Sequence, residues 1–416
     1  MMMSLRLVLL LTSSALIAAP AFAERNDLPP PEAVAQALDN APAVRASVAR
    51  IDSAKASENA LRAGPYEVTV SASAIRRSVT RERDYAEFDA TVSRPFRLPG
   101  KARLDRSAGA LGVEVASNNA EDARHQAALM LSGLWHDWLL ASALYRNDQL
   151  NITYNQQALA AVKRRMALRD AAALDVDQTQ SVLSQAQAQA AQSLSAVKRA
   201  RLALATEFPQ IPLSNAAPDL APPEMPEERL QTLRNLVLGR SHEIRAADRE
   251  AQRLAVVARR AKLDRVADPS FGVRLFSERD GLERGAGIVA SMPFGGSHRR
   301  ALADRASSEA SAALIDVERI RRSITVIADT DMSDGAALFD AWCASRDAAT
   351  SAAAAAARTA RGYTVGVIDL SDVLYAQRQA NDARRTEIAA RAEAARALFR
   401  LRIDSHTIWT PGGEAE

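Results

Sequence analysis

The 416-residue chain carries 53 basic and 50 acidic residues, which gives a formal net charge of +3. The basic residues are scattered along helical stretches rather than clustered with aromatics, which argues against a nucleic-acid-binding protein. The single cysteine, Cys343, excludes an intrachain disulfide. Hydrophobic residues make up 48% of the chain and aromatics only 5%. This alanine-dominated composition favours long, closely packed helices over a compact globule.

Residues 1–23 are predicted to form a secretory signal peptide. Arg6 precedes the apolar run LVLLLTSSALIAAP, and Ala21-Phe22-Ala23 fits the small-residue cleavage rule. The run is too short for a transmembrane anchor, and no later apolar run is long enough to cross a bilayer as a helix. No cysteine stands at the cleavage point, so N-terminal lipid attachment is not expected.

The remaining sequence is duplicated. The stretch VSRPFRLPGKARLDRSAGA (92–110) is echoed by ASMPFGGSHRRALADRASSEA (290–310), and each passes from a strand-like run through Pro-Phe and glycine into an alanine-rich helix. A helix with a short break, at 37–56, likewise recurs at 236–255. Such self-similarity at a fixed spacing indicates a repeat architecture.

We therefore predict two structural repeats joined by a proline-rich segment that no helix could cross. The predicted divisions of the mature chain are a first repeat at 24–211, a linker at 212–228, a second repeat at 229–405 and a C-terminal tail at 406–416.

Each repeat is predicted to contain one pair of strands, at 66–76 and 85–95 in the first and at 270–276 and 285–293 in the second. Apolar and polar residues alternate with period two along the first pair, which gives one apolar and one polar face. The second pair is less regular: Phe271, Val273 and Leu275 alternate with Gly272 and Arg274, whereas residues 285–292 are mostly small and apolar. The pattern fits either a half-buried sheet of a soluble protein or a membrane barrel that is apolar outside and polar within. Four strands cannot close a barrel, so the membrane interpretation requires an oligomer in which each chain donates two hairpins.

A long helical hairpin is predicted to follow each strand pair, at 100–208 and 297–403. At ~1.5 Å per residue, a 70-residue helix forms a rod of roughly 100 Å, which suits a structure that crosses a wide aqueous space. The strand-to-helix junctions are marked by four residues: Pro95, Gly100, Pro293 and Gly295. The basic residues just after them are expected near a lipid–water boundary: Lys101, Arg103, His298, Arg299 and Arg300.

Taken together, these features resemble the TolC-type outer-membrane efflux channels, over about residues 28 to 405. The most specific stretch is GYTVGVIDLSDVL (362–374), followed by Ala376-Gln377. The resemblance implies an α+β membrane protein in the bacterial outer membrane. In it, four strands per chain contribute to a trimeric twelve-stranded β-barrel, and long helical hairpins form a periplasmic α-barrel. It also implies docking to a periplasmic adaptor protein and to an inner-membrane pump of the RND type, or an ABC transporter.

The resemblance also assigns a gate at the periplasmic tip. Asp372 matches an aspartate of an acidic ring there, while Tyr363 and Asp175 match residues that bond across neighbouring helices to hold the tip shut. The tip turn before the last helix includes Gly366 and Asp369. Two departures bear on gating: Tyr375 stands where a second ring aspartate is expected, and Ile368 where a gate arginine is expected. Without the resemblance, Asp175 and Asp372 would be explained as ordinary solvent-exposed aspartates in the first turn of a helix.

The form RPFRLPGK at the first junction resembles the branch of the family that exports heavy-metal cations. General drug export and type I protein secretion stay open as alternatives, because the pump selects the cargo. No catalytic motif was found, which argues against an enzyme. A periplasmic adaptor is a weaker alternative, because an adaptor has one helical hairpin. No cofactor is expected, and no metal site either, since His125 and His136 lie ~16 Å apart along one helix.

Overall fold

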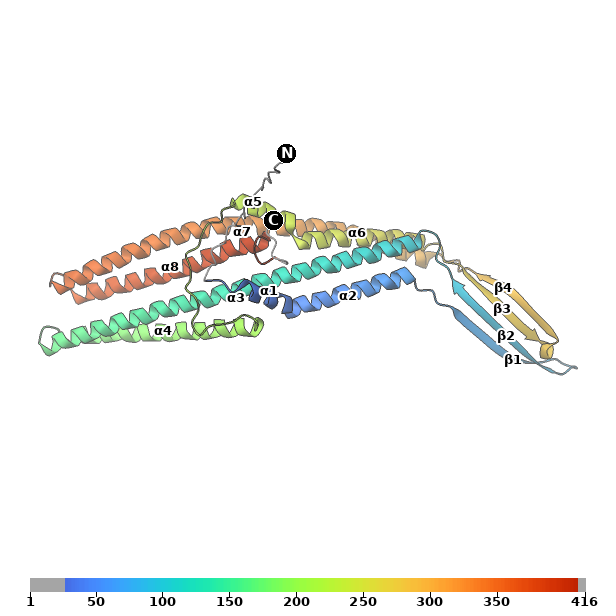
Figure 1. Cartoon of the computed structure of the whole chain (residues 1–416), viewed down its shortest axis with the longest axis horizontal. Coiled ribbons are helices and arrows are strands. Elements are labelled where there is room, and N and C mark those ends of the chain that lie inside the picture. Colours follow the sequence, from blue (N-terminus) through green and yellow to red (C-terminus); the bar gives the residue numbers. More distant parts are fainter. Residues whose placement is uncertain (1–26, 411–416) are drawn as a thin grey trace, which may run out of the picture.

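The computed structural model describes residues 27–410, and the predicted signal peptide lies outside this range. The molecule is strongly elongated, with a four-stranded sheet at one end and the turns of two helical hairpins at the other (Figure 1). It combines long helices with one antiparallel sheet, as the sequence predicted. No helix within residues 27–410 combines the length and the apolar character needed to cross a membrane.

The first half of the chain begins with two short helices, continues through a strand pair and ends in a long hairpin. Its elements are α1 (Pro31–Asn40), α2 (Pro42–Ala63), β1 (Thr69–Ser78), β2 (Asp84–Pro95), α3 (Lys101–Ala167) and α4 (Ala173–Glu207).

The second half repeats this order about two hundred residues later, as expected of a duplicated chain. Its elements are α5 (Leu230–Arg240), α6 (His242–Leu263), β3 (Ser270–Glu278), the one-turn η1 (Arg279–Gly281), β4 (Glu283–Ser291), α7 (Ser297–Thr364) and α8 (Leu370–Asp404).

The break between the two short helices has a different cause in each half. Pro42 opens α2, where its missing N–H costs no helical hydrogen bond, and Ala41 before it is extended. In the second half Ser241 caps α6, because its hydroxyl oxygen accepts a hydrogen bond from the Ile244 N–H at 3.1 Å.

The four strands form one antiparallel sheet in chain order, and the pairing of β2 with β3 joins the two halves. Within the described chain, the outer edges of β1 and β4 have no strand partner. Six of the eight strand ends differ from the predicted ones, each by one to three residues. β1 starts at Thr69 rather than at residue 66, and β4 ends at Ser291, before Pro293, which has no N–H for a ladder.

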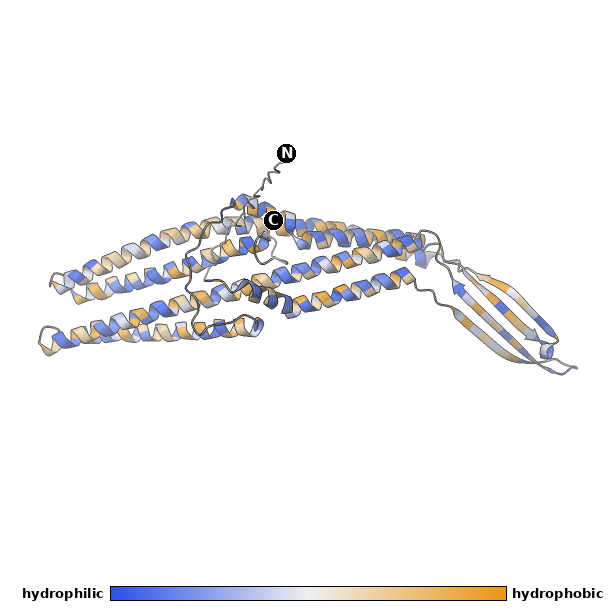
Figure 2. Ribbon diagram, in the orientation of Figure 1, coloured by the Kyte–Doolittle hydropathy of each residue, from blue (hydrophilic) through white to orange (hydrophobic). Residues whose placement is uncertain are grey.

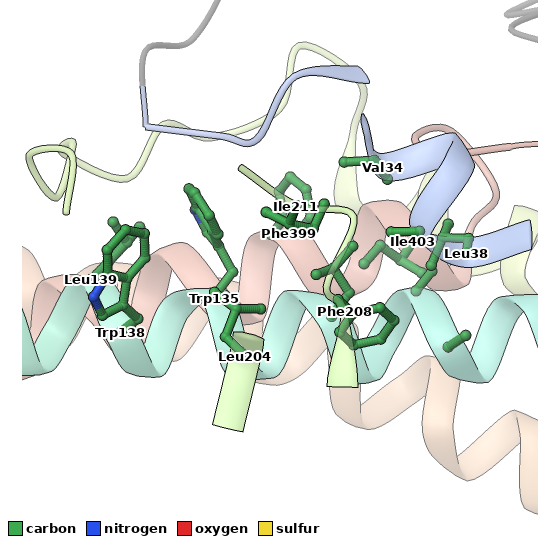
Figure 3. Packing of buried hydrophobic residues seen from close by; sticks show 14 of the residues in the cluster. Val34, Leu38, Trp135, Trp138, Leu139, Leu204, Phe208, Ile211, Phe399 and Ile403 are labelled. Atoms are coloured by element: carbon green, nitrogen blue, oxygen red, sulfur yellow. The ribbon is translucent and has the colours of Figure 1, made fainter. Parts of the chain in front are cut away.

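The described residues form two apolar clusters, a small one between α5, α7 and the end of α8 and a larger one near the middle of the molecule. There α1, α3, the end of α4 and α8 pack around Trp135, Trp138 and Leu139 (Figure 3). The two indole rings lie edge to face, 5.2 Å apart, and Trp135 Nε1 donates to the Asp27 carbonyl at 2.7 Å. These tryptophans therefore pack between helices.

The proline-rich segment between α4 and α5 is held against the hairpins by arginines. Arg146 of α3 donates to the carbonyls of Ala217 and Pro218 at 2.9 and 3.2 Å, and Arg391 of α8 donates to that of Leu220 at 3.2 Å. The segment is thus bound to one helix of each hairpin, close to the apolar core.

Candidate functional site

One face of the sheet is apolar and exposed. Val70, Val92, Val273 and Ile288 stand opposite one another across the four strands, which places them on the same face. Their exposed fractions are 67, 48, 54 and 85%. The residues of this apolar face are Val70, Ala72, Ala74, Phe88, Ala90, Val92, Phe271, Val273, Leu275, Ala286, Ile288 and Ala290. Figure 2 shows the mixture of hydrophobic and hydrophilic residues along the strands. An exposed apolar surface of this kind marks contact with a membrane or a partner.

The opposite face of the sheet carries charged and hydroxyl side chains together with Ile75, Tyr85, Phe276 and Val289, and two ion pairs cross between its strands. Arg77 of β1 lies 2.7 Å from Glu87 of β2, and Arg274 of β3 forms an ion pair with Asp89. The predicted alternation is therefore present, with one apolar face and one polar face. It matches the pattern of a membrane barrel with a polar interior.

The first strand-to-helix junction is built as a tight turn. Pro95 ends β2 opposite Ser270 of β3, and Gly100 takes φ 89° just before α3 begins. This left-handed conformation is the one that glycine adopts without steric cost. The chain can therefore turn from strand to helix within five residues.

Lys101, expected at a lipid–water boundary, is instead buried, with 1% of its side chain exposed. Its ammonium lies 2.8 Å from Asp268 and 3.0 Å from Asp264, and it donates to the Val266 carbonyl at 2.8 Å. The reason is that the segment between α6 and β3 folds over it and supplies two carboxylates. Burial would raise the pKa of Asp268, but the hydrogen bonds from Lys101, Tyr66 and the Leu98 N–H lower it.

The rest of the RPFRLPGK motif also makes structural contacts. Arg97 donates to the carbonyls of Leu61 and Arg62 at the end of α2, at 2.8 and 2.7 Å, and pairs with Asp105 at 3.0 Å. The motif thus fastens the sheet to α2 and α3.

The second junction is far more exposed. Phe294, between Pro293 and Gly295, is 95% exposed, and Gly295 lies beneath the Arg299 side chain. Arg299 donates to the Asp264 carbonyl at 3.1 Å. Both junctions are consequently anchored on the connection between α6 and β3.

The two helical tips turn with the same backbone geometry. After α7, Gly366 has φ 80°, and the Val367 N–H closes the turn on the Gly362 carbonyl at 3.0 Å. After α3, Arg169 takes φ 61°, and the Asp170 N–H bonds the Arg165 carbonyl at 2.9 Å. The duplication is therefore preserved at the tips, with an arginine at the position equivalent to the glycine.

The candidate gate aspartates lie at the starts of the two returning helices. Asp175 is in the first turn of α4, where its carboxylate accepts a hydrogen bond from the Ala172 N–H at 3.0 Å. Asp369 immediately precedes α8, and Asp372 lies exposed in its first turn. Tyr375 is also exposed, and its hydroxyl accepts a hydrogen bond from Gln379 at 3.1 Å.

Tyr363 connects the two hairpins at the tips. Its ring lies under the Arg165 guanidinium, 4.9 Å from the ring centre. Arg165 also donates to the Asp170 carboxylate at 2.7 Å, and this bond is the main cause of its raised pKa. Arg165 was not singled out from the sequence, because nothing near it indicates a contact with Tyr363, almost two hundred positions later.

Apolar side chains are exposed at both tips. Leu168 and Leu174 flank the first turn, and Val365 and Val367 flank the second, with exposed fractions of 63 to 79%. Large apolar residues at the end of a helical rod indicate a contact surface for another protein.

Three of the five histidines meet in the middle of the molecule, which sequence analysis did not predict. The His406 ring lies 4.9 Å from that of His125 and 4.8 Å from that of His242. Within residues 27–410, however, no three histidine, cysteine, aspartate or glutamate side chains are arranged to hold a metal ion.

No protein-family model matches the sequence. No curated protein matches it either. Solved structures do match the fold. A membrane protein from Pseudomonas aeruginosa aligns with a TM-score of 0.76 at 19% identity, over 90% of this chain and 92% of that one. The outer membrane protein VceC from Vibrio cholerae aligns with a TM-score of 0.73 at 17% identity, over 90% of this chain and 95% of that one. The MtrE outer membrane channel from Neisseria gonorrhoeae was solved in an open state. It aligns with a TM-score of 0.67 at 16% identity, over 90% of this chain and 88% of that one.

The chain has the TolC-type outer-membrane channel fold. The aligned share of about nine-tenths is far more than the sheet or either hairpin alone could supply. The family resemblance seen in the sequence is thus confirmed in the fold. Because the identities are low, function must be argued from the physical features of this chain.

Proposed function

We propose that the protein is the outer-membrane channel of a tripartite efflux system, a passive duct across the periplasm and the outer membrane. The observation that carries the proposal is the exposed apolar face of the sheet, set at one end of two ~100 Å helical rods. The apolar face suits lipid, and the rods suit passage through a wide aqueous compartment. Transport energy then comes from the pump in the inner membrane, and the duct itself catalyses no reaction.

The channel is a homotrimer in this proposal. The free edges of β1 and β4 each need a partner, because unpaired backbone groups are not tolerated within a bilayer. Three chains joined edge to edge give twelve strands, above the minimum of about eight for a closed membrane barrel. The polar faces then line the lumen, where the ion pairs of Arg77 and Arg274 lie in water.

The tips dock to a periplasmic adaptor and through it to an RND-type pump or an ABC transporter. The exposed apolar residues at both tips, Leu168, Leu174, Val365 and Val367, provide the contact surface. Tyr363, Asp175 and Asp372 form the gate, with Asp372 from three chains making a negatively charged ring near the axis.

For the cargo we propose heavy-metal cations, on the basis of the RPFRLPGK resemblance. The contacts of Arg97 and Lys101 give this motif a structural role, so it does not itself select cargo. General drug export and type I secretion are the competing outcomes. Growth of a deletion strain and its complemented parent on zinc, cadmium, copper, detergents and antibiotics separates them. Sensitivity to drugs and detergents without sensitivity to metals contradicts metal export.

The membrane assignment is tested by placing a charge on each face of one strand. Ile288 belongs to the apolar face, whereas the next residue, Val289, belongs to the polar face. Ile288→Arg should lose most of the folded oligomer from the outer-membrane fraction, because arginine near the bilayer midplane costs about 2–4 kcal/mol. Val289→Arg is the matched control.

The readout is the amount of the heat-modifiable oligomer on gels of membrane extracts, which also separates a channel from a periplasmic adaptor. Equal amounts of oligomer in the two variants, or a monomeric wild-type protein in the soluble periplasmic fraction, would contradict the proposed function.

A further inference from the structure

His125, His242 and His406 come from three different elements and lie in one row, called here the histidine column, in which the His406 ring is tilted by 38° to that of His125 and stands edge-on to that of His242. His125 lies on α3, His242 is the first residue of α6, and His406 is in the turn after α8. The His406 ring stands between the other two at 4.9 and 4.8 Å. They line a small cavity with Trp409 and Thr410.

Of the three rings, His125 is the one that the structure pairs with a carboxylate. Its Nε2 lies 2.8 Å from Asp404 Oδ1. His242 has the opposite environment, since its Nδ1 is buried with no hydrogen-bond partner. The titratable and charged groups around the column come from α3, α5, α6, α7 and α8: Glu121, Asp122, Arg124, Arg240, Glu243, Arg245, Asp331, Asp334, Arg400 and Asp404.

The column holds the C-terminal segment 404–410 in place together with a few other contacts. Arg240 donates to the His406 carbonyl and Arg124 to the Trp409 carbonyl, both at 2.9 Å. The Trp409 ring packs edge to face on Phe399 at 4.8 Å. His406 has φ 53°, a left-handed conformation in which histidine and asparagine are found more often than most residues.

We propose that the His125–His406–His242 column is an acid-sensitive latch, which docks the segment 404–410 against α3 and α6 and releases it when His406 and His242 become protonated. In the docked form a proton on His406 would lie within 5 Å of the charged His125 ring, and a proton on His242 as well would place a second like charge within 5 Å on the other side. Arg240, bound to its carbonyl, adds further positive charge. Release moves these charges into water.

The docked segment is favoured at high pH because the His406 and His242 rings are neutral in it. Burial, followed by the neighbouring charges of His125 and His242, lowers the pKa of His406 to about 3. Burial likewise lowers the pKa of His242. A histidine with a depressed pKa in the docked state favours docking in full above its free pKa of about 6.5, and this preference is lost as the pH falls. At pH 5 the loss from His406 alone is about 30-fold in the docking equilibrium.

His125 acts in the opposite direction and is not the trigger. Burial lowers its pKa, but the hydrogen bond and charge of Asp404 outweigh burial and raise it. Its contribution to docking is therefore present below pH 6.5 and lost as the pH rises. A charged His125 repels a proton on the neighbouring His406 ring, which makes protonation of His406 unfavourable in the docked state.

The test measures the mobility of the segment directly. Cys343 is the only cysteine of the chain, so Cys343→Ser with Thr410→Cys places one nitroxide label on the segment of the full-length protein. Electron paramagnetic resonance spectra in detergent at pH 7.5 and pH 5 should show a label that is immobile at the higher pH and largely mobile at the lower. Equal spectra at the two pH values would overturn the proposal.

His406→Asn tests the trigger, because asparagine tolerates the left-handed turn but does not titrate. We expect its label to stay immobile at both pH values, and His242→Gln to reduce the pH response. His298→Gln, at an exposed position at the start of α7, should keep the full response. A label in His406→Asn that is already mobile at pH 7.5, with unchanged far-ultraviolet circular dichroism, would assign the docking to ring packing and overturn the latch. None of these readouts depends on transport.

Discussion

The guanidinium of Arg165 lies 4.9 Å from the centre of the Tyr363 ring, and this contact joins the tip of one hairpin to the tip of the other. Arg165 is itself fixed by Asp170, whose carboxylate and carbonyl both accept hydrogen bonds from it. The tip of α7 is therefore tied to the turn between α3 and α4 within one chain. A channel that opens by separating its hairpins has to break this contact.

Replacing Tyr363 with alanine should open the tip, because the arginine loses the ring on which it lies. We expect a higher single-channel conductance in planar bilayers, and a similar rise for Arg165→Gln. Arg346→Gln is the matched control, since Arg346 lies over Trp342 at 5.3 Å but within a single helix. Unchanged conductance in both tip variants would show that the contact does not hold the gate.

Asp372→Ala should weaken the block of the channel by multivalent cations. In the proposed trimer three Asp372 carboxylates lie near one axis and attract a trivalent cation, so their removal should raise the half-blocking concentration on the order of tenfold. Asp382→Ala removes an exposed charge from the same helix about 15 Å further along, beyond the screening length at physiological ionic strength. An equal effect of the two substitutions would place the acidic ring elsewhere.

Much of the fold could be predicted from local sequence. The second tip was recognised from the family resemblance of GYTVGVIDLSDVL. By contrast, alternation identified the strands, and proline and glycine marked the junctions at Pro95 and Gly100. These signals are local because each depends on the backbone preferences of a few residues.

The parts that could not be predicted depend on contacts between distant segments. The burial of Lys101 could not be predicted because its carboxylate partners are more than 160 residues away, on the connection between α6 and β3. The histidine column has the same origin, since spacing along one helix says nothing about His242 and His406. Arg165 was missed for this reason as well.

Lys101→Met should destabilise the junction by about 3–5 kcal/mol, because it leaves the buried carboxylate of Asp268 without its cation. The measurement is the shift of the unfolding midpoint, followed by circular dichroism in detergent. Arg103→Met is the control, since Arg103 is exposed two residues further along the same helix. The double variant Lys101→Met/Asp268→Asn should recover part of the loss. If the double variant is less stable than Lys101→Met alone, the unpaired charge of Asp268 is not the cause of the destabilisation.

The carboxyl groups of Asp331 and Asp404 make the stability of the folded protein depend on pH, in the opposite direction to the effect of His406 on docking. Arg400 lies 3.0 Å from Asp331 and 3.3 Å from Asp404, yet Asp331 Oδ2 is buried without a hydrogen-bond partner. Burial, with the neighbouring Asp404, raises the pKa of Asp331 to about 8. A carboxyl group whose pKa is raised in the folded state contributes its stability in full below about pH 3.8 and loses it as the pH rises towards 8.

Asp331→Asn removes this titration while keeping the shape of the side chain. We therefore expect the stability of the variant relative to the wild type to increase from pH 5 to about pH 8 and then to level off up to pH 9, as measured by unfolding midpoints at each pH. Asp329→Asn is the control, because Asp329 is exposed and pairs with Arg234. If the difference between Asp331→Asn and the wild type is constant across this range, Asp331 is already ionised at pH 5.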